Sequence, residues 1–109
     1  MGRRRRERPE RLAEKLRQLR ERLGLSQAEM IRAMGLADRL TKSEVSAFER
    51  GTHEPSLLVL LAYCEVANIY LEALVRDSLK LPDKLPAVKK HEGIPLRLSK
   101  RLDKPSASK

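Results

Sequence analysis

The side chains that most often do chemistry in proteins are few and scattered in this sequence. The histidines are His53 and His91, and the single cysteine is Cys64. These residues are too few and too far apart to form a structural zinc site, and Cys64 lies in an apolar stretch where a cysteine is typically a small core residue. The sequence also contains no glycine-rich phosphate loop and no Ser/His/Asp set. It therefore predicts a protein that is not an enzyme and that has no metal site or cofactor.

The positive charge of the chain is concentrated in its two flanks. The formal net charge is +9. Residues 1–8 carry five Arg and one Glu, residues 9–75 carry nine basic and ten acidic residues, and residues 76–109 carry ten basic and four acidic residues. Basic flanks around a nearly neutral centre favour a polyanionic partner. Nucleic acid is favoured over a membrane surface because neither flank predicts an amphipathic helix; a purely solubilising role is the alternative.

Composition favours a small helical domain. The aromatic residues are Phe48, Tyr63 and Tyr70, and tryptophan is absent, so the core must be aliphatic, which suits packed helices better than a β-sandwich. One cysteine cannot form an internal disulfide. No apolar stretch follows the first six residues, so we expect no signal peptide, and the longest apolar run, residues 57–64, is too short to cross a bilayer. A soluble cytoplasmic protein is expected.

Helix start and stop signals divide residues 9–78 into five expected helices. The first starts at Pro9, carries an apolar stripe that leaves Lys15 outside, and ends before Gly24. Capping boxes at residues 26–29 and 41–44 start the second and third helices, which end at Gly35 and Gly51. Ser56 caps a fourth helix that ends at Asn68, and the fifth covers residues 71–78. The stripe of the first helix consists of Leu12, Leu16, Leu19 and Leu23.

The remaining segments are expected to be extensions of this domain. Residues 1–8 form a basic arm, and residues 79–109 form a Pro/Lys-rich tail that we expect to be flexible and largely disordered. Within the tail, apolar residues alternate with other residues from Ile94 to Leu98. This alternation could add a strand to a partner protein or to a second copy of the chain, or it could be chance.

Four sequence stretches resemble the phage-repressor helix-turn-helix family, which includes the Cro and lambda-type repressors. They are residues 23–29, 34–35, 48–51 and 55–61, and the resemblance covers residues 10–75. It implies an all-α, five-helix DNA-binding domain whose third helix lies in the major groove and reads base edges. In this sequence the outward residues at the start of that helix are short and mostly polar.

The resemblance implies roles for individual residues. Lys42, Ser43 and Ala47 occupy base-reading positions, and Ser46, which also faces outward on that helix, is counted with them as a base-reading residue. Gln27 matches a phosphate-holding position, and the arm residues Arg3, Arg4, Arg5 and Arg6 would add phosphate or minor-groove contacts. One such domain covers a half-site, so a homodimer is expected, with Tyr70, Leu71 and Leu74 exposed on the fifth helix as its interface. We also expect Glu49 and Arg50 to serve the electrostatics of the domain, with an ion pair to the first helix.

The turn between the second and third helices departs from the family. Residues 36–40 lie between Gly35 and Thr41, four more than usual, and Ile31 stands where the family has alanine. Either the two helices are splayed, or Leu36 and Leu40 form an extra helical turn over the core. Arg39 on this turn is a candidate phosphate contact. His53, in the loop after the third helix, could contact phosphate or simply be solvated.

Three functions follow from these features. The first is a transcriptional regulator that binds double-stranded DNA at a near-palindromic operator as a homodimer. The second is an antitoxin-type or other interaction module whose tail binds a partner protein. The third is non-specific RNA or ribosome binding through the basic flanks.

Overall fold

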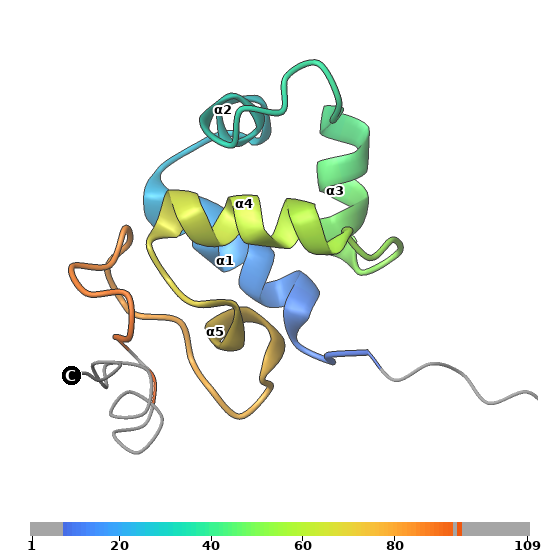
Figure 1. Ribbon diagram of the computed structural model, residues 1–109. Coiled ribbons are helices and arrows are strands. Elements are labelled where there is room, and N and C mark those ends of the chain that lie inside the picture. The colour runs from blue at the N-terminus through green and yellow to red at the C-terminus, as the bar shows by residue number, and fades with distance from the viewer. Residues whose placement is uncertain (1–7, 93, 95–109) are drawn as a thin grey trace, which may run out of the picture.

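A computed structural model describes residues 8–92 and residue 94, and in this part of the chain it contains five helices and no strands. The helices are α1 (Leu12–Leu23), α2 (Gln27–Ala33), α3 (Lys42–Arg50), α4 (Leu57–Ala67) and α5 (Leu71–Val75). α1 is central, because it packs against α3, α4 and α5, and α2 packs against α3 (Figure 1). The expected all-helical fold with five helices is confirmed.

Both capping boxes are present. The Ser26 side chain accepts a hydrogen bond from the backbone N–H of Glu29, and the Thr41 side chain accepts one from that of Glu44. Each glutamate in turn accepts from the backbone N–H of its cap residue. Since these bonds satisfy N–H groups that have no partner within the helix, α2 and α3 start where the sequence predicts.

The other expected helix ends are formed largely as predicted. Ser56 caps α4 by accepting from the backbone N–H of Val59 at 3.3 Å. Gly24, Gly51 and Asn68 adopt the left-handed conformation that ends α1, α3 and α4, as expected for glycine and asparagine. Local sequence signals therefore fix most helix boundaries in this fold.

The start of α1 was predicted wrongly. The helix begins at Leu12 and not at Pro9, and its cap residue Arg11 makes no capping bond with its own side chain. Instead the Asp77 carboxylate accepts from the backbone N–H groups of Glu10 and Arg11, both at 3.0 Å. Residues 10 and 11 are thereby held in a turn in front of the helix.

The predicted end of α5 and the predicted exposure of Lys15 were also wrong. α5 ends at Val75 and not at Ser78, and Lys15 is 1% exposed and not outside the apolar stripe. The Lys15 ammonium donates to the backbone carbonyls of Ala73 at 2.9 Å and Arg76 at 2.6 Å. Burial, followed by the charge of Arg11, lowers the pKa of Lys15. A lysine of α1 thus satisfies carbonyl groups at the end of α5.

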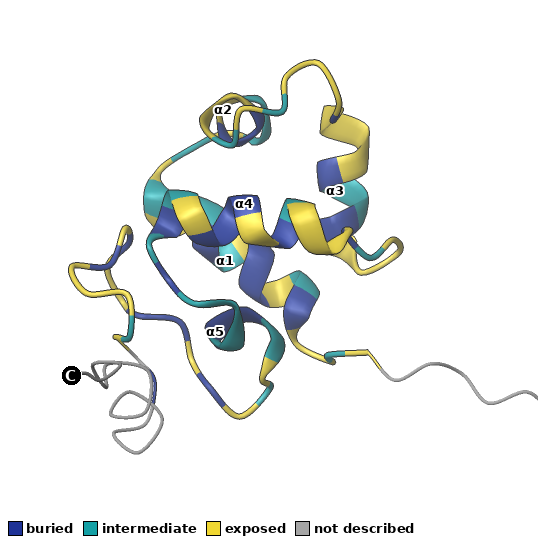
Figure 2. Cartoon of the chain, in the orientation of Figure 1, coloured by how far each residue is buried: buried dark blue, intermediate teal, exposed yellow. Residues whose placement is uncertain are grey.

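The core is mainly aliphatic, as predicted, and the aromatic side chains of Phe48 and Tyr63 are buried in it as well. The completely buried side chains include Leu16, Leu19, Met30, Val45 and Tyr63. Figure 2 shows buried positions along α1, α3 and α4. The Tyr63 hydroxyl is buried among the described residues without a hydrogen-bond partner. Burial raises the pKa of this hydroxyl.

The turn between α2 and α3 is a single helical turn. The backbone N–H of Leu40 donates to the Leu36 carbonyl at 2.9 Å, Leu40 is buried, and Leu36 packs against the core. Ile31 is also buried, at 5% exposed. Of the two expected arrangements, the extra helical turn over the core is therefore the one present.

Part of the expected disordered tail is folded against the domain. Leu81, Leu85 and Ala87 belong to the core, and the backbone N–H of Ala87 donates to the Ala67 carbonyl at 2.9 Å. The Asn68 amide donates to the Ala87 carbonyl at 2.7 Å. The prediction of a flexible tail from residue 79 is thus wrong for residues 79–92. Their apolar side chains, although spaced apart in the sequence, are buried against the helices. Of the alternating segment, Ile94 is buried, and residues 95–98 lie outside the described residues.

Candidate nucleic-acid interface

The first turn of α3 presents polar side chains to the outside. Lys42 and Ser43 are exposed, and Ser46 and Ala47 are half-buried one turn later. Ser43 and Ala47 line a shallow hollow of about 410 Å³ together with Glu44, Thr52 and His53. The capping box holds one Glu44 oxygen against the Thr41 backbone N–H at 2.9 Å. This surface can therefore offer an ammonium, a hydroxyl and a methyl group to a base edge.

Ser46 is engaged by another residue of the same helix. The Arg50 guanidinium donates a hydrogen bond to the Ser46 hydroxyl, one turn away along α3. Arg50 is exposed, so its guanidinium is placed on the outer surface of α3. Arg50 was expected to serve the electrostatics of the domain, and this position was not predicted, although the four-residue spacing from Ser46 indicates a shared face.

Behind this surface, α3 is joined to α1 by a partly buried ion pair. The Arg20 guanidinium donates to both carboxylate oxygens of Glu49, at 2.7 and 2.9 Å, and the two side chains are 15% and 6% exposed. The hydrogen bond from Arg20 to Glu49 raises the pKa of Arg20. The expected ion pair between Glu49 and the first helix is confirmed. Two parallel hydrogen bonds in this geometry fix the direction of both side chains.

Gln27 is linked to the same ion pair. Its side-chain amide donates to a Glu49 oxygen at 3.3 Å, and Gln27 is the first residue of α2. Gln27 is half-buried, so part of its side chain remains accessible to other contacts. Arg20, Glu49 and Gln27 therefore connect the first three helices at one point.

The loop after α3 carries the next candidate residue. The His53 ring stacks on Phe48 with a centroid separation of 5.7 Å and an interplanar angle of 15°. Because Phe48 is 4% exposed, the histidine ring rests on the core while the residue itself is exposed. This stacking is a contact that neither sequence interpretation of His53 included.

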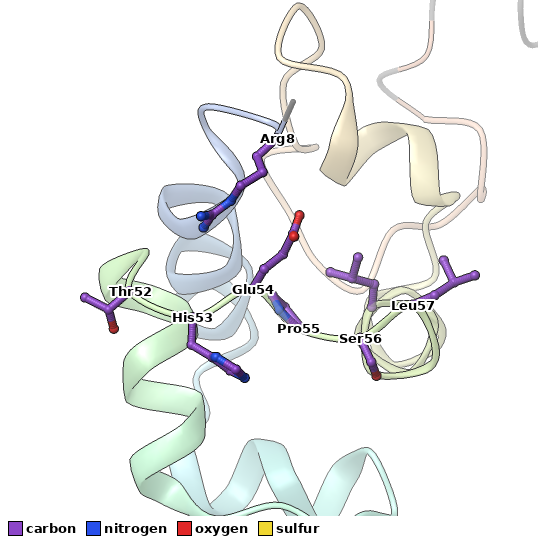
Figure 3. Close-up of a pocket in the computed structure, with 8 residues that line it drawn as sticks. Arg8, Thr52, His53, Glu54, Pro55, Ser56 and Leu57 are labelled. Atoms are coloured by element: carbon purple, nitrogen blue, oxygen red, sulfur yellow. The ribbon is translucent and has the colours of Figure 1, made fainter. Parts of the chain in front are cut away.

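A second hollow continues from this loop toward the basic arm. It has a volume of about 620 Å³ and is lined by Arg8, Thr52, His53, Glu54, Pro55, Ser56, Leu57 and Leu60. Figure 3 shows the Arg8 side chain extending toward the loop that carries His53. Thr52 and His53 line this hollow and also the one on α3. The surface is therefore continuous from α3 to the residue where the arm joins the domain.

The other candidate residues fall in different places. Arg39 is exposed on the extra turn and lines a groove beside the start of α4. Arg3, Arg4, Arg5 and Arg6 lie outside the described residues. Tyr70 and Leu71 are half-buried, with the Lys90 ammonium 5.3 Å from the centre of the Tyr70 ring. Leu74 is completely buried, so the expectation that it is exposed on a dimer surface is wrong.

Among residues 8–92 and 94, no group of three or more His, Cys, Asp or Glu side chains could hold a metal ion. No helix in that part of the chain has the length and apolar character needed to span a membrane. Cys64 is buried, which raises its thiol pKa to about 12, so the thiol stays protonated near neutral pH.

Together, the capped short helices α2 and α3 on a helical scaffold define a helix-turn-helix DNA-binding domain. The family model described as "Helix-turn-helix domain" matches residues 11–76, and the chain belongs to this family, which is of the XRE and lambda-repressor-like kind. The resemblance stated from the sequence is thereby confirmed. Searches of curated proteins and of solved structures gave no match.

Proposed function

We propose that this protein is a sequence-specific transcriptional regulator that binds a near-palindromic operator as a homodimer. The observation that carries the proposal is the first turn of α3, where Lys42 and Ser43 are exposed on a helix whose opposite face is buried in the core. Such a helix can enter the major groove while the rest of the domain rests on the phosphate backbone.

The proposal gives each part of the surface a role. Lys42, Ser43 and Ala47 read base edges. The sequence places Ser46 among the base-reading residues, but we propose that it instead holds the Arg50 guanidinium on the outer face of α3. Gln27, Arg39 and His53 contact phosphates, as do the arm residues Arg3, Arg4, Arg5 and Arg6. The protein acts in the cytoplasm and is not an enzyme.

In vitro selection of binding sites from random duplexes tests this function. The full chain is expected to enrich one sequence with two related half-sites. The Lys42→Ala variant is then expected to lose about 1–3 kcal/mol of discrimination at one base position in each half-site. Lys89→Ala removes the same charge from an exposed residue outside the surface, so it should leave the selected sequence unchanged.

One result would contradict the proposal, and a second would favour the alternative function. Enrichment of no sequence, with a steep salt dependence of binding, would instead support non-specific binding to nucleic acid through the basic flanks. Loss of a co-purifying protein on deletion of residues 95–109, with operator binding intact, would support an antitoxin-type module. The deletion starts after residue 94 because residues 79–92 are part of the folded domain.

A further inference from the structure

Arg50 lies in the middle of the outward face of α3. The helix buries Val45 and Phe48 in the core, at 0% and 4% exposed. With 3.6 residues per turn, positions 43, 47 and 50 fall on the side opposite to these two residues. Arg50 is exposed, and Ser43 and Ala47 line the hollow on α3. Arg50 therefore shares the face that carries two of the proposed base readers.

The side chains around Arg50 on this face are short. Ser43, Ser46 and Ala47 end in a hydroxyl or a methyl group, so they leave space in front of the helix. Arg50 is about 10 Å further along the helix axis than Ser43. Side chains on a helix point back toward its N-terminus, so the long Arg50 side chain covers the preceding turn. The guanidinium is thereby directed toward the part of α3 that presents Ser43 and Ala47.

The Ser46 hydroxyl fixes the direction of the Arg50 side chain. The Nη1 group of Arg50 donates to the Ser46 Oγ atom, one turn closer to the start of α3. An arginine has five N–H donors in a planar fork, so this bond leaves the Nε–H and Nη2–H groups along another edge. Two donors on one edge match the O6 and N7 acceptors of guanine, and this pairing is the commonest specific contact to DNA. The contact with Ser46 thus orders the guanidinium before DNA binds and leaves a base-binding edge.

The charge of Arg50 has no carboxylate partner in the described part of the chain, where the ion pairs join other residues. The acidic residues of its own helix are held elsewhere. The Glu49 carboxylate accepts from Arg20 behind α3, and Glu44 accepts from the backbone at the start of the helix. Glu54, in the loop after α3, lines the hollow next to the arm and not the one on α3. An exposed guanidinium in this setting suits acceptors that are supplied by DNA.

We propose that Arg50 is a specificity-determining residue that reads one guanine in each half-site, and that Ser46 positions its guanidinium for this contact. The inference rests on the proposed function, because it requires α3 to lie in the major groove. It extends base reading from the first turn of α3 to its last turn. Lys42 and Arg50 then make different contacts. The lysine ammonium is a flexible point charge, whereas the planar guanidinium makes two bonds of fixed geometry.

Site selection with a charge-conserving variant tests the base contact. Arg50→Lys keeps the positive charge but cannot form two parallel hydrogen bonds. It is expected to lose at least about tenfold in preference for guanine at one position of each half-site. Its affinity for a duplex of unrelated sequence should be unchanged, because that binding depends on charge. Arg32→Lys is the matched control, since Arg32 is exposed in the last turn of α2, and it should select the same sequence as the natural chain.

A phosphate contact by Arg50 would give the opposite pattern. Arg50→Lys would then select the same sequence as the natural chain, and Arg50→Ala would weaken binding to all sequences alike and reduce the salt slope by about one. This result overturns the proposal and leaves the proposed function intact. Enrichment of no sequence by the natural chain rejects the proposed function, and the role of Arg50 with it. Circular dichroism checks that each variant is folded.

Replacing the selected guanine by 7-deazaguanine tests the same contact from the DNA side. The replacement removes the N7 acceptor, so it should weaken binding of the natural chain about tenfold. It should have little effect on binding of Arg50→Ala, which has already lost the contact. Equal weakening of the two chains overturns the proposal.

Variants of Ser46 test its positioning role. Ser46→Ala should reduce the guanine preference at the base position that Arg50 reads and at no other. Ser46→Thr should retain the preference, because its hydroxyl can accept the same hydrogen bond. In the Arg50→Ala background, Ser46→Ala should cause no further loss of preference. An unchanged preference in Ser46→Ala, or a further loss in that background, overturns the positioning role.

Discussion

The two sides of this domain secure their helix ends in different ways. α2 and α3 are each capped by residues three positions apart, Ser26 with Glu29 and Thr41 with Glu44. The start of α1 is instead capped by Asp77, which is 67 and 66 residues away from its two donors. The end of α5 is satisfied by Lys15, 58 residues before Ala73. The side formed by α2 and α3 is thus capped locally, and the side formed by α1 and α5 is capped through tertiary structure.

The two kinds of cap form under different conditions. A local cap forms whenever its own helix forms, so α2 and α3 carry their stabilising contacts with them. The caps of α1 and α5 exist only when both helices are docked. The contacts of Lys15 and Asp77 therefore depend on the assembly of the whole domain, whereas those of Ser26 and Thr41 depend on single helices.

The largest expected effect comes from breaking the ion pair that joins the two sides. Glu49→Ala leaves the partly buried Arg20 guanidinium without its carboxylate and releases Gln27. We expect a loss of about 3 kcal/mol in the free energy of unfolding, measured by urea denaturation. Glu21→Ala removes a carboxylate from a 4.0 Å pair on the exposed face of α1 and should cost less than about 0.5 kcal/mol. Equal losses of stability in Glu49→Ala and Glu21→Ala would contradict the expected difference between the partly buried and the exposed ion pair.

Removing the tertiary cap of α5 is expected to have the next largest effect. Lys15→Met keeps the length of the side chain but leaves the carbonyls of Ala73 and Arg76 without their donor. The expected loss is about 2 kcal/mol in the same measurement. Arg17→Met, on the exposed side of α1, is the control. If Lys15→Met is as stable as the natural chain, the buried ammonium contributes no net stability.

Removing a local cap should cost less. Thr41→Ala deletes the oxygen that accepts from the Glu44 backbone N–H at 3.2 Å. The expected loss is about 1 kcal/mol, and Thr41→Ser should retain most of the stability because its hydroxyl can make the same bond. A larger loss than for Lys15→Met would reverse the order of the two kinds of cap.

The smallest expected effect is a change in acid sensitivity. Hydrogen bonds from the backbone N–H groups of Glu10 and Arg11 lower the pKa of Asp77 below its usual 3.8. A carboxylate whose pKa is lower in the folded chain than in the unfolded chain stabilises the fold at pH values above its pKa in the unfolded chain. This contribution is lost as the pH falls through its pKa in the folded chain. The unfolding temperature should therefore fall on acidification below about pH 4, and less steeply in Asp77→Asn. Parallel curves for the two chains would show that Asp77 is not coupled to folding.

The sequence predicted the parts of this fold that depend on neighbouring residues. The two capping boxes and the ends of α1, α3 and α4 are local signals, and all are present. The buried Lys15 and the α1 start were missed because their partners lie more than 50 residues away in the chain. The packing of residues 79–92 was missed because their apolar side chains are interrupted by prolines and lysines, which resemble a flexible tail.

In the candidate site, too, the sequence predicted some features and missed others. Exposure of Lys42 and Ser43 follows from the periodicity of α3, and the ion pair of Glu49 with α1 was expected. The contact of Arg50 with Ser46 is local to α3 and was missed although their spacing indicates it. The stacking of His53 on Phe48 and the hollow at Arg8 depend on how the loop after α3 and the start of the chain are placed against the domain.

The position of Asp77 also sets an order of events during synthesis. A ribosome releases the chain from its N-terminal end, so α2 and α3 emerge with both residues of each capping box already present. The first turn of α1 is made earlier than either but has no cap until residue 77 has emerged. Of the five helices described, the first to be made is therefore among the last to be completed.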